Sequence, residues 1–305
     1  MVVDSVFNKN KELNNNNMLK IENSQNFLHS KKLVVKLIER SNINKNDIII
    51  EIGPGKGIIT KELSIKSKKV YGIEYDLHLY KKLKHMFSDI KNVEIIYENF
   101  LEFELPEKYK YKIFSSIPFN ITAEILLKIT SCSNPPKDTY IIIQEEAARK
   151  YAGNPYNNEC MRSLLLKPYF DFEIIYKLKN TDFTPIPKVN SVLLHIKKRE
   201  NILINQNEAE LYRDFIAYVF SSSGKSIKER CKYIFSHKQL KRLSQDIGFQ
   251  TTDSPVNLSF EQWLRVFQYF IVGVSIDKQR LVYNSYSRHL NEQKKIDKVH
   301  RNFRS

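Results

Sequence analysis

The stretch that decides the fold runs from Asp47 to Gly57 and reads Asp-Ile-Ile-Ile-Glu-Ile-Gly-Pro-Gly-Lys-Gly. Its first half is a continuous apolar run, which is typical of a strand buried on both faces of a parallel sheet. Three of the chain's 8 glycines follow at once, at Gly53, Gly55 and Gly57. Because glycine permits positive φ angles and lets a ligand approach the backbone, the stretch predicts a strand, a ligand-binding loop and a helix.

Short β-rich runs alternate with helix-length segments beyond this loop. After the first strand, Asp47–Ile52, the pattern predicts six more: Val70–Glu74, Val93–Tyr97, Tyr111–Ser115, Thr139–Gln144, Phe172–Leu178 and Val192–Lys197. Alternating strands and helices indicate an α/β domain with a doubly wound, mostly parallel sheet. A proline-containing loop, and no obvious helix, joins the last two strands, so we expect an antiparallel edge pair there.

Composition divides the chain into four parts. Residues 1–22 are polar and contain the run Asn14–Asn17, so we expect a flexible tail. Residues 23–200 carry the strands and form the α/β domain. Residues 201–270 show only helical spacing and form a small all-helical domain. Residues 271–305 form a basic tail, because from Asp277 onward 8 Lys and Arg stand against 3 Asp and Glu.

The whole chain is strongly basic. Its 305 residues hold 49 Lys and Arg against 34 Asp and Glu, a net charge of +15, which favours a polyanionic partner such as nucleic acid. With 42% hydrophobic residues the chain can form a sizeable core, which excludes a wholly disordered protein. No apolar run approaches the ~20 residues of a spanning helix, and Met1–Leu13 does not resemble a secretory signal. The cysteines, Cys132, Cys160 and Cys231, form no CxxC pair. We therefore expect a cytoplasmic protein with no membrane segment, no disulfide framework and no metal.

The glycine loop and a later carboxylate together indicate a nucleoside cofactor. The pattern G-x-G-x-G is neither the dinucleotide G-x-G-x-x-G nor a P-loop, which suits a nucleoside or amino-acid moiety better than a pyrophosphate. Glu74 ends the second strand, where a carboxylate can accept both hydroxyls of a ribose. The alternatives are a plain tight turn for the loop and a solvated strand end for Glu74.

Two stiff, aromatic loops complete the candidate site. Ser116-Ile117-Pro118-Phe119 follows the fourth strand, so its Ser116 and Ile117 oxygens can accept hydrogen bonds from an exocyclic amine that lies on the Phe119 ring. Phe183 heads a second loop, which contains Pro185 and Pro187. Two such aromatics can hold a flipped-out base between them. Alternatively, the first loop is a strand-to-helix turn, and Phe183 is a buried core residue.

In order and spacing, these motifs resemble the ribosomal RNA adenine-N6 dimethyltransferases over residues 23–270. The motifs that carry the resemblance are Gln25–Leu28, Glu51–Gly57, Ile73–Asp76, Ser116–Phe119 and Phe183–Ser191. Ile117 before the proline and the run Leu258–Leu264 make the chain most similar to the Erm enzymes, which methylate 23S rRNA and confer resistance to macrolides, lincosamides and streptogramin B. The resemblance implies a Rossmann-like class I S-adenosylmethionine methyltransferase domain.

The resemblance also implies which residues bind and react. S-adenosylmethionine would be the methyl donor, with cofactor contacts from Gln25, Asn26, Leu28, Glu51, Gly53, Gly55, Gly57, Glu74, Tyr75, Asn99, Phe100 and Ser116. Catalysis would fall to Ser116, Ile117, Pro118, Phe119 and Phe183. Asn99 stands where the family usually has Asp, Ser116 where it has Asn, and Phe119 is one of the two aromatics found at its position. An Asn oxygen still accepts a hydrogen bond, but without the help of a negative charge.

The segment Lys225–Arg242 carries seven Lys and Arg and one Glu, with Tyr233 and Phe235 among them. It is either a solvated helix face or an RNA-binding surface that uses Lys225, Lys228, Arg230, Lys232, Lys241 and Arg242. We expect a monomer whose partner is 23S rRNA. The alternatives are a KsgA-type enzyme that dimethylates 16S rRNA in ribosome biogenesis and a non-catalytic nucleic-acid-binding relative. A DNA adenine methyltransferase is disfavoured, because no separate sequence-reading domain is evident.

Overall fold

The computed structural model describes residues 26–302, so the expected tail of residues 1–22 and Gln25 lie outside the described part. The chain forms two compact units. The first comprises the described residues up to Ala148 together with Phe172–Lys198, and the second comprises Arg149–Asp171 together with the chain from Arg199 onward. Sequence alone had placed Arg149–Asp171 in the first domain.

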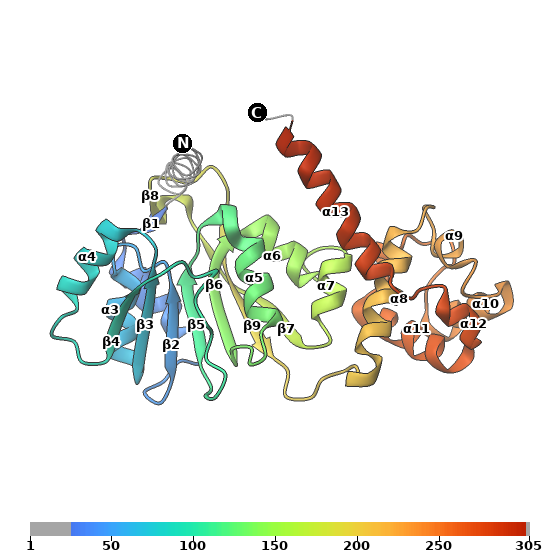
Figure 1. Cartoon of the computed structure of the whole chain (residues 1–305), viewed down its shortest axis with the longest axis horizontal. Coiled ribbons are helices and arrows are strands. Elements are labelled where there is room, and N and C mark those ends of the chain that lie inside the picture. The colour runs from blue at the N-terminus through green and yellow to red at the C-terminus, as the bar shows by residue number, and fades with distance from the viewer. Residues whose placement is uncertain (1–25, 303–305) are drawn as a thin grey trace, which may run out of the picture. The chain divides into compact units, whose positions relative to one another are not determined.

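The first unit is built on a seven-stranded sheet of order β4-β3-β2-β5-β6-β9-β7 (Figure 1). The strands are β2 (Ile48–Ile52), β3 (Lys69–Glu74), β4 (Val93–Tyr97), β5 (Lys112–Ser116), β6 (Asp138–Gln144), β7 (Phe170–Leu178) and β9 (Ser191–Lys198). The pairs from β4 across to β6 are parallel, and β9 runs antiparallel to β6. All seven predicted strands are confirmed, and the strand order reverses at β2, where such sheets bind ligands at their carboxyl ends.

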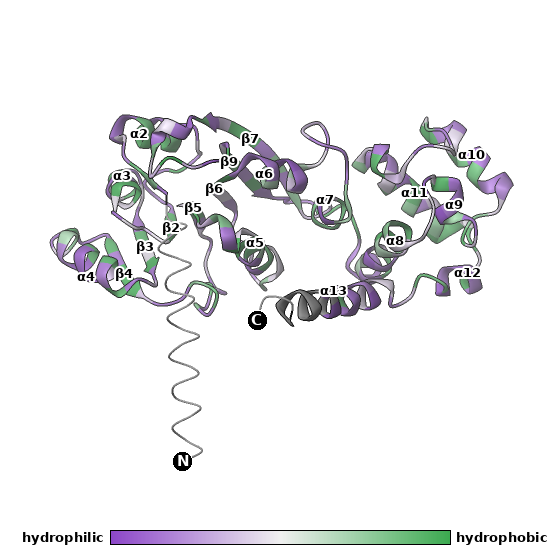
Figure 2. Ribbon diagram, turned by 90° about the horizontal axis from the view of Figure 1, so that it is seen from above, coloured by the Kyte–Doolittle hydropathy of each residue, from purple (hydrophilic) through white to green (hydrophobic). Residues whose placement is uncertain are grey.

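Helices cover both faces of this sheet. In the view from above, α2 (Lys31–Glu39), α3 (Ile58–Lys66) and α4 (Leu77–Met86) lie on one side, and α5 (Thr122–Ser131) and α6 (Glu145–Ala152) lie on the other (Figure 2). Side chains fix two of the starts: Ser30 Oγ accepts from Leu33 N at 3.2 Å, and Asp76 Oδ1 accepts from Leu79 N at 2.8 Å. Such caps satisfy backbone donors that have no partner inside the helix.

A two-stranded ladder, which the sequence did not reveal, joins distant parts of the first unit. β1 (Phe27–Leu28) runs antiparallel to β8 (Phe183–Thr184), with Phe27 opposite Thr184 and Leu28 opposite Phe183. His29 Nε2 lies 2.8 Å from the carbonyl oxygen of Thr181 and extends the contact. With two residues on each side, the ladder is too short for a periodic signal.

The second unit is helical. It contains α7 (Met161–Leu166), α8 (Ala209–Ser221), α9 (Ile227–Cys231), α10 (His237–Ile247), α11 (Phe260–Gly273), α12 (Ile276–Arg280) and α13 (Ser285–Asn302). Its core includes the fully buried Trp263, whose indole N–H donates to Pro255 O at 3.0 Å. Ser259 begins α11 with a reciprocal capping box.

Residues 271–305 were expected to form a basic tail, but the described part of this segment is helical and docked. From Asp277 to Asn302 the chain forms most of α12 and all of α13, and Val282 between them is completely buried. The buried carboxylate of Asp214 on α8 accepts from the backbone N–H groups of Asn284 (2.7 Å) and Tyr286 (3.0 Å). Composition missed this segment because the buried apolar side chain of Val282 and a carboxylate distant in sequence, that of Asp214, hold it against the rest of the unit. No helix within residues 26–302 is both long and apolar enough to cross a membrane.

Candidate active site

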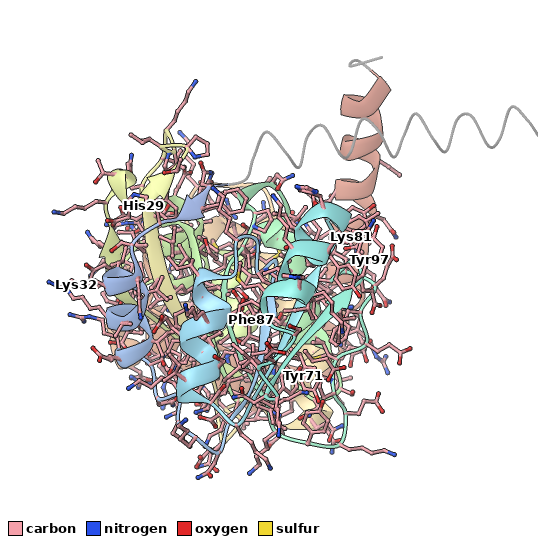
Figure 3. The ribbon with its side chains drawn as sticks, turned by 90° about the vertical axis from the view of Figure 1, so that its left-hand side faces the viewer. His29, Lys32, Tyr71, Lys81, Phe87 and Tyr97 are labelled. Atoms are coloured by element: carbon pink, nitrogen blue, oxygen red, sulfur yellow. The ribbon has the colours of Figure 1, made fainter. Side chains whose placement is uncertain are left out.

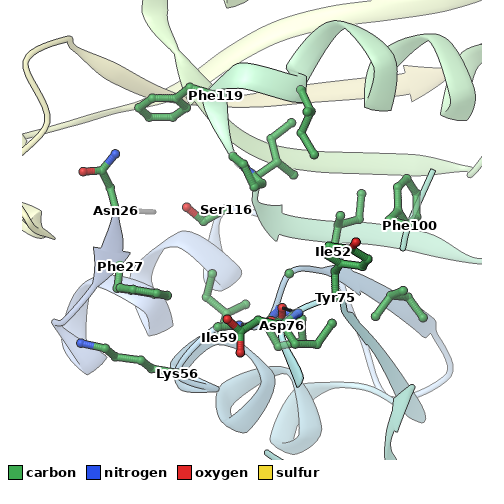
Figure 4. Close-up of a pocket in the computed structure, with 18 of the residues that line it drawn as sticks. Asn26, Phe27, Ile52, Lys56, Ile59, Tyr75, Asp76, Phe100, Ser116 and Phe119 are labelled. Atoms are coloured by element: carbon green, nitrogen blue, oxygen red, sulfur yellow. Dashed lines mark hydrogen bonds between the residues drawn. The ribbon is translucent and has the colours of Figure 1, made fainter. Parts of the chain in front are cut away.

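A pocket of about 370 Å³ opens at the carboxyl ends of the central strands (Figure 4). Its walls come from five places in the sequence: β1 with the residue before it, the glycine loop with the start of α3, the end of β3, the end of β4, and the loop after β5. Of the residues predicted from sequence, it gathers Asn26, Leu28, Gly53, Gly55, Glu74, Tyr75, Asn99, Phe100, Ser116, Ile117, Pro118 and Phe119.

The glycine loop turns where only glycine fits well. Gly53, Gly55 and Gly57 have φ angles of 61°, 60° and 79°. A Cβ on Gly55 would stand 2.7 Å from the Phe27 ring, and one on Gly57 would stand 2.9 Å from Leu83. Because Gly55 has no side chain, the loop backbone can pack closely against the Phe27 ring. Gly57 lies outside the pocket lining and caps α3, so its position indicates packing against α4 and not a direct ligand contact.

Glu74 closes the floor of the pocket and is tied to the glycine loop. Its Oε2 accepts from Gly55 N at 3.0 Å, and its Oε1 accepts from Asp76 N at 2.9 Å. The residue is only 4% exposed, and burial raises the pKa of its carboxyl, while the two backbone N–H groups act in the opposite direction. A solvated strand end is thus excluded. Each oxygen retains a lone pair for a further hydrogen bond.

Glu51 lies behind the loop and does not line the pocket. It is 1% exposed, and burial raises the pKa of its carboxyl to about 8. Its Oε2 has no hydrogen-bond partner among the described residues. The structure therefore places this predicted cofactor residue one layer deeper than expected, as a buried acid beneath the glycine turn.

The segment after β4 forms a turn closed by its own side chains. Asn99 Oδ1 accepts from Leu101 N at 3.0 Å, and Asn99 Nδ2 donates to Glu102 Oε1 at 3.3 Å. Phe100 is 4% exposed, and Lys128 Nζ lies 5.7 Å from the centre of its ring. Asn99 thus keeps the turn in shape and also lines the pocket.

The loop after β5 forms the wall opposite the glycines. Ser115 Oγ accepts from Ile52 N at 2.5 Å and ties β5 to the strand before the glycine loop. Pro118 is extended, with φ −60° and ψ 131°, and Thr122 Oγ1 donates to Phe119 O at 3.1 Å. Figure 4 shows the Phe119 ring across the pocket from the glycine loop, with the Ser116 hydroxyl between them. Ile117 is buried, whereas Ser116 and Phe119 are partly exposed.

Phe183 does not belong to this pocket. Its side chain is 1% exposed and packs in the core with Leu28, Phe114 and Leu193. The expectation that Phe183 offers an open ring face to a base is therefore wrong, and the alternative, a buried core residue, is confirmed. The cause is the β1–β8 ladder, which turns the ring inward opposite Leu28.

The predicted RNA-binding segment, Lys225–Arg242, contains residues that are used inside the fold and residues that are exposed. Arg230 is not free for RNA: its guanidinium donates to the carbonyls of Gly224, Val219 and Phe220 and so holds the end of α8. Phe235 is 2% exposed and belongs to the core, so it cannot stack on a base. The remaining predicted cations, Lys225, Lys228, Lys232, Lys241 and Arg242, are exposed.

Several pocket residues were missed from sequence. Phe27, Lys56, Asp76 and Asn120 line the pocket, and Lys56 Nζ lies 4.8 Å from the centre of the Phe27 ring. Each is adjacent in sequence to a predicted site residue, so the signal available was proximity to a motif. In residues 26–302, no group of three or more His, Cys, Asp or Glu side chains could hold a metal ion.

Comparison with known proteins identifies the family. The profile of the family described as "Ribosomal RNA adenine dimethylase" matches residues 16–271. The chain belongs to this family. An rRNA adenine N-6-methyltransferase of Bacteroides fragilis is 31% identical over 245 residues, 80% of this chain and 90% of that protein. A probable ribosomal RNA small subunit methyltransferase A of Methanococcus vannielii is 34% identical over 205 residues, 67% of this chain and 76% of that protein.

A solved structure supports the same assignment. The 23S rRNA methyltransferase ErmE superimposes with a TM-score of 0.75 at 25% identity and covers 81% of this chain and 100% of that one. The fold and the Erm/KsgA-type resemblance are thereby confirmed. The family match ends at residue 271, so α12 and α13 lie beyond it.

The methyl donor of this family member is S-adenosylmethionine, and the pocket fits it. The volume lies within the range of small-molecule sites, about 300–1,000 Å³. The pocket holds one buried carboxylate, at Glu74, and a turn at Gly55 that a Cβ would crowd. A carboxylate suits a ribose diol, and a bare turn suits close contact with an amino-acid moiety.

Proposed function

We propose that this dimethylase transfers methyl groups to the N6 amine of a specific adenine in 23S rRNA, first one and then a second, and thereby confers resistance to macrolides, lincosamides and streptogramin B. One observation carries the proposal: a single pocket brings together the Ser116–Phe119 loop and the glycine loop with Glu74. The similarity to ErmE and the Ile117 of the loop motif support 23S rRNA as the substrate.

The pocket residues have distinct proposed roles toward the donor. Glu74 accepts hydrogen bonds from the ribose hydroxyls, Gly53 and Gly55 border the methionine part, and Asn99 accepts a hydrogen bond from the adenine amine. Asn26, Leu28, Tyr75 and Phe100 complete the walls. When bound, the donor supplies an electrophilic methyl group on a sulfonium.

The loop after β5 acts on the other reactant, the target adenine. Phe119 supports the flipped base by stacking, while the Ser116 hydroxyl and the Ser116 and Ile117 carbonyl oxygens accept the amine hydrogens. The lone pair of the nitrogen is delocalised into the ring, so the residues must turn that lone pair toward the methyl group. These hydrogen bonds strengthen as the nitrogen becomes pyramidal, which favours the transition state over the ground state.

Mass mapping of methyl groups tests the substrate. Deproteinised 23S rRNA and small ribosomal subunits would each be incubated with the protein and labelled donor. One dimethylated adenine in 23S rRNA, and none in the small subunit, is the expected result. Methylation only of the small subunit would overturn the proposal in favour of the KsgA-type alternative, which the relative from Methanococcus vannielii supports. Donor binding without transfer to either RNA would indicate a non-catalytic relative.

A further inference from the structure

A line of three cations runs along α2, away from the pocket. Lys32 and Lys36 lie on α2, and Arg40 caps its end in a helical conformation, so the three follow one another at intervals of four residues. Side chains at this spacing share one helix face and stand about 5–6 Å apart. All three are exposed, and Figure 3 shows Lys32 extending outward from the helix. We call Lys32, Lys36 and Arg40 the α2 ridge.

An aromatic ring on the neighbouring strand holds two of these cations. Lys36 Nζ lies 5.0 Å, and Arg40 Cζ 5.3 Å, from the centre of the Tyr176 ring on β7. Arg40 also donates to Ile175 O at 3.3 Å. The ring contacts restrict both long side chains and keep their charged ends at the surface. Less rotational freedom is then lost when an anion binds.

The charge of the ridge is not neutralised within the described part of the chain. None of its three cations lies within 4.0 Å of a carboxylate there, whereas Lys31, on a different face of α2, pairs with Glu62 at 3.5 Å. The one acid on α2 is Glu39, which is exposed. Like charges one helical turn apart repel each other, so an external anion bound along the ridge would relieve this repulsion.

The position of the ridge relative to the pocket indicates which anion. Leu28 lines the pocket, and only His29 and Ser30 separate it from the start of α2. A polynucleotide whose base enters the pocket has further phosphates within reach of the adjacent surface. A row of cations at regular spacing suits such a repeating anion, which it would position without reading sequence.

We propose that the α2 ridge binds the phosphate backbone of the rRNA strand that carries the target adenine. This inference rests on the proposed function, because it takes RNA as the substrate. The ridge then adds affinity and sets the register in which the adenine meets Phe119, while the pocket itself binds the donor independently.

The test compares two triple variants with equal charge loss. The first replaces Lys32, Lys36 and Arg40 by Gln, and the matched control replaces the exposed Lys81, Lys82 and Lys84 of α4 by Gln. Binding to deproteinised 23S rRNA is measured between 50 and 200 mM salt, together with the donor Kd and the melting temperature. A third variant, Lys32→Arg with Lys36→Arg, keeps the charge.

The expected result is specific to the ridge. The triple Gln variant of the ridge raises the RNA Kd by about tenfold at 50 mM salt. It also makes the slope of log affinity against log salt concentration shallower by about two to three. The control and the Arg variant bind RNA like the wild type, and all four proteins bind the donor equally. Equal RNA binding by the two Gln variants would overturn the proposal that the α2 ridge binds RNA, and would leave the proposed function intact. Failure of the wild type to bind or methylate any rRNA would instead overturn the proposed function, and the ridge proposal with it.

Discussion

The carboxylate of Glu74 is hydrogen-bonded to the backbone of Gly55, with Oε2 3.0 Å from the amide nitrogen. The acid at the end of β3 and the glycine loop after β2 therefore form one unit, although 18 residues lie between them. A ligand that binds the carboxylate meets a loop already in place, so little further ordering is needed on binding.

Replacing Glu74 by Gln is expected to weaken donor binding by about 10- to 100-fold, because hydrogen bonds to a charged group are lost and one amide NH₂ must face a backbone N–H. Isothermal titration with S-adenosylhomocysteine measures this effect. Glu94→Gln, at the exposed partner of Lys69, is the matched control. An unchanged Kd in Glu74→Gln would remove Glu74 from the donor site.

Phe119→Ala is expected to slow methyl transfer by about 5- to 150-fold, since stacking on a base is worth about 1–3 kcal/mol. Donor affinity and melting temperature should stay near the wild-type values, because the ring is only partly buried. Single-turnover rates at saturating donor measure the loss. Leu127→Ala, at a 64% exposed position on α5, controls for the removal of an apolar side chain. A wild-type rate in Phe119→Ala would show that Phe119 does not support the target base by stacking.

Ser116→Ala is expected to lower the single-turnover rate by about tenfold, because one acceptor for the target amine is lost. Ser116→Asn restores the residue usual in the family and should recover or exceed the serine rate. Rates for both variants on the same 23S rRNA fragment provide the measurement. If Ala and Asn both react like Ser, the side chain has no part in the reaction and the backbone carbonyls act alone.

The sequence predicted the sheet and most of the pocket because those signals are local. Continuous apolar runs mark the strands, and Gly53, Gly55 and Glu74 stand where strands end. The errors arise where a distant contact decides the outcome. Arg230 looks like a surface cation, yet it holds three carbonyls at the end of α8. Asp214 likewise docks a segment some 70 positions away, which no window of sequence contains.

Phe183 provides a direct test of such a long-range contact. Because its ring is 1% exposed in the core beside Leu28, Phe183→Ala is expected to lower the free energy of unfolding by about 3–5 kcal/mol. Phe183→Leu should lose less, since it leaves a smaller cavity. Urea denaturation measures both, with Ile186→Ala, at a 65% exposed position on the same loop, as the control. If Phe183→Ala keeps full stability but loses methyl transfer, Phe183 acts in the active site and not in the core.

The buried acid Glu51 predicts how stability varies with pH. Its pKa is raised from 4.5 to about 8 by burial, so the folded protein holds a proton that the unfolded chain releases between these values. The stabilisation is complete below pH 4.5 and is lost as the pH rises toward 8, by at most about 1.4 kcal/mol per pH unit. Glu51→Gln, which is always neutral, removes this dependence. The variant should therefore gain stability relative to the wild type between pH 5.5 and pH 8 in urea denaturation. Glu39→Gln, at an exposed acid of α2, serves as control, and a constant difference between Glu51→Gln and the wild type would show that Glu51 is ionised in the fold.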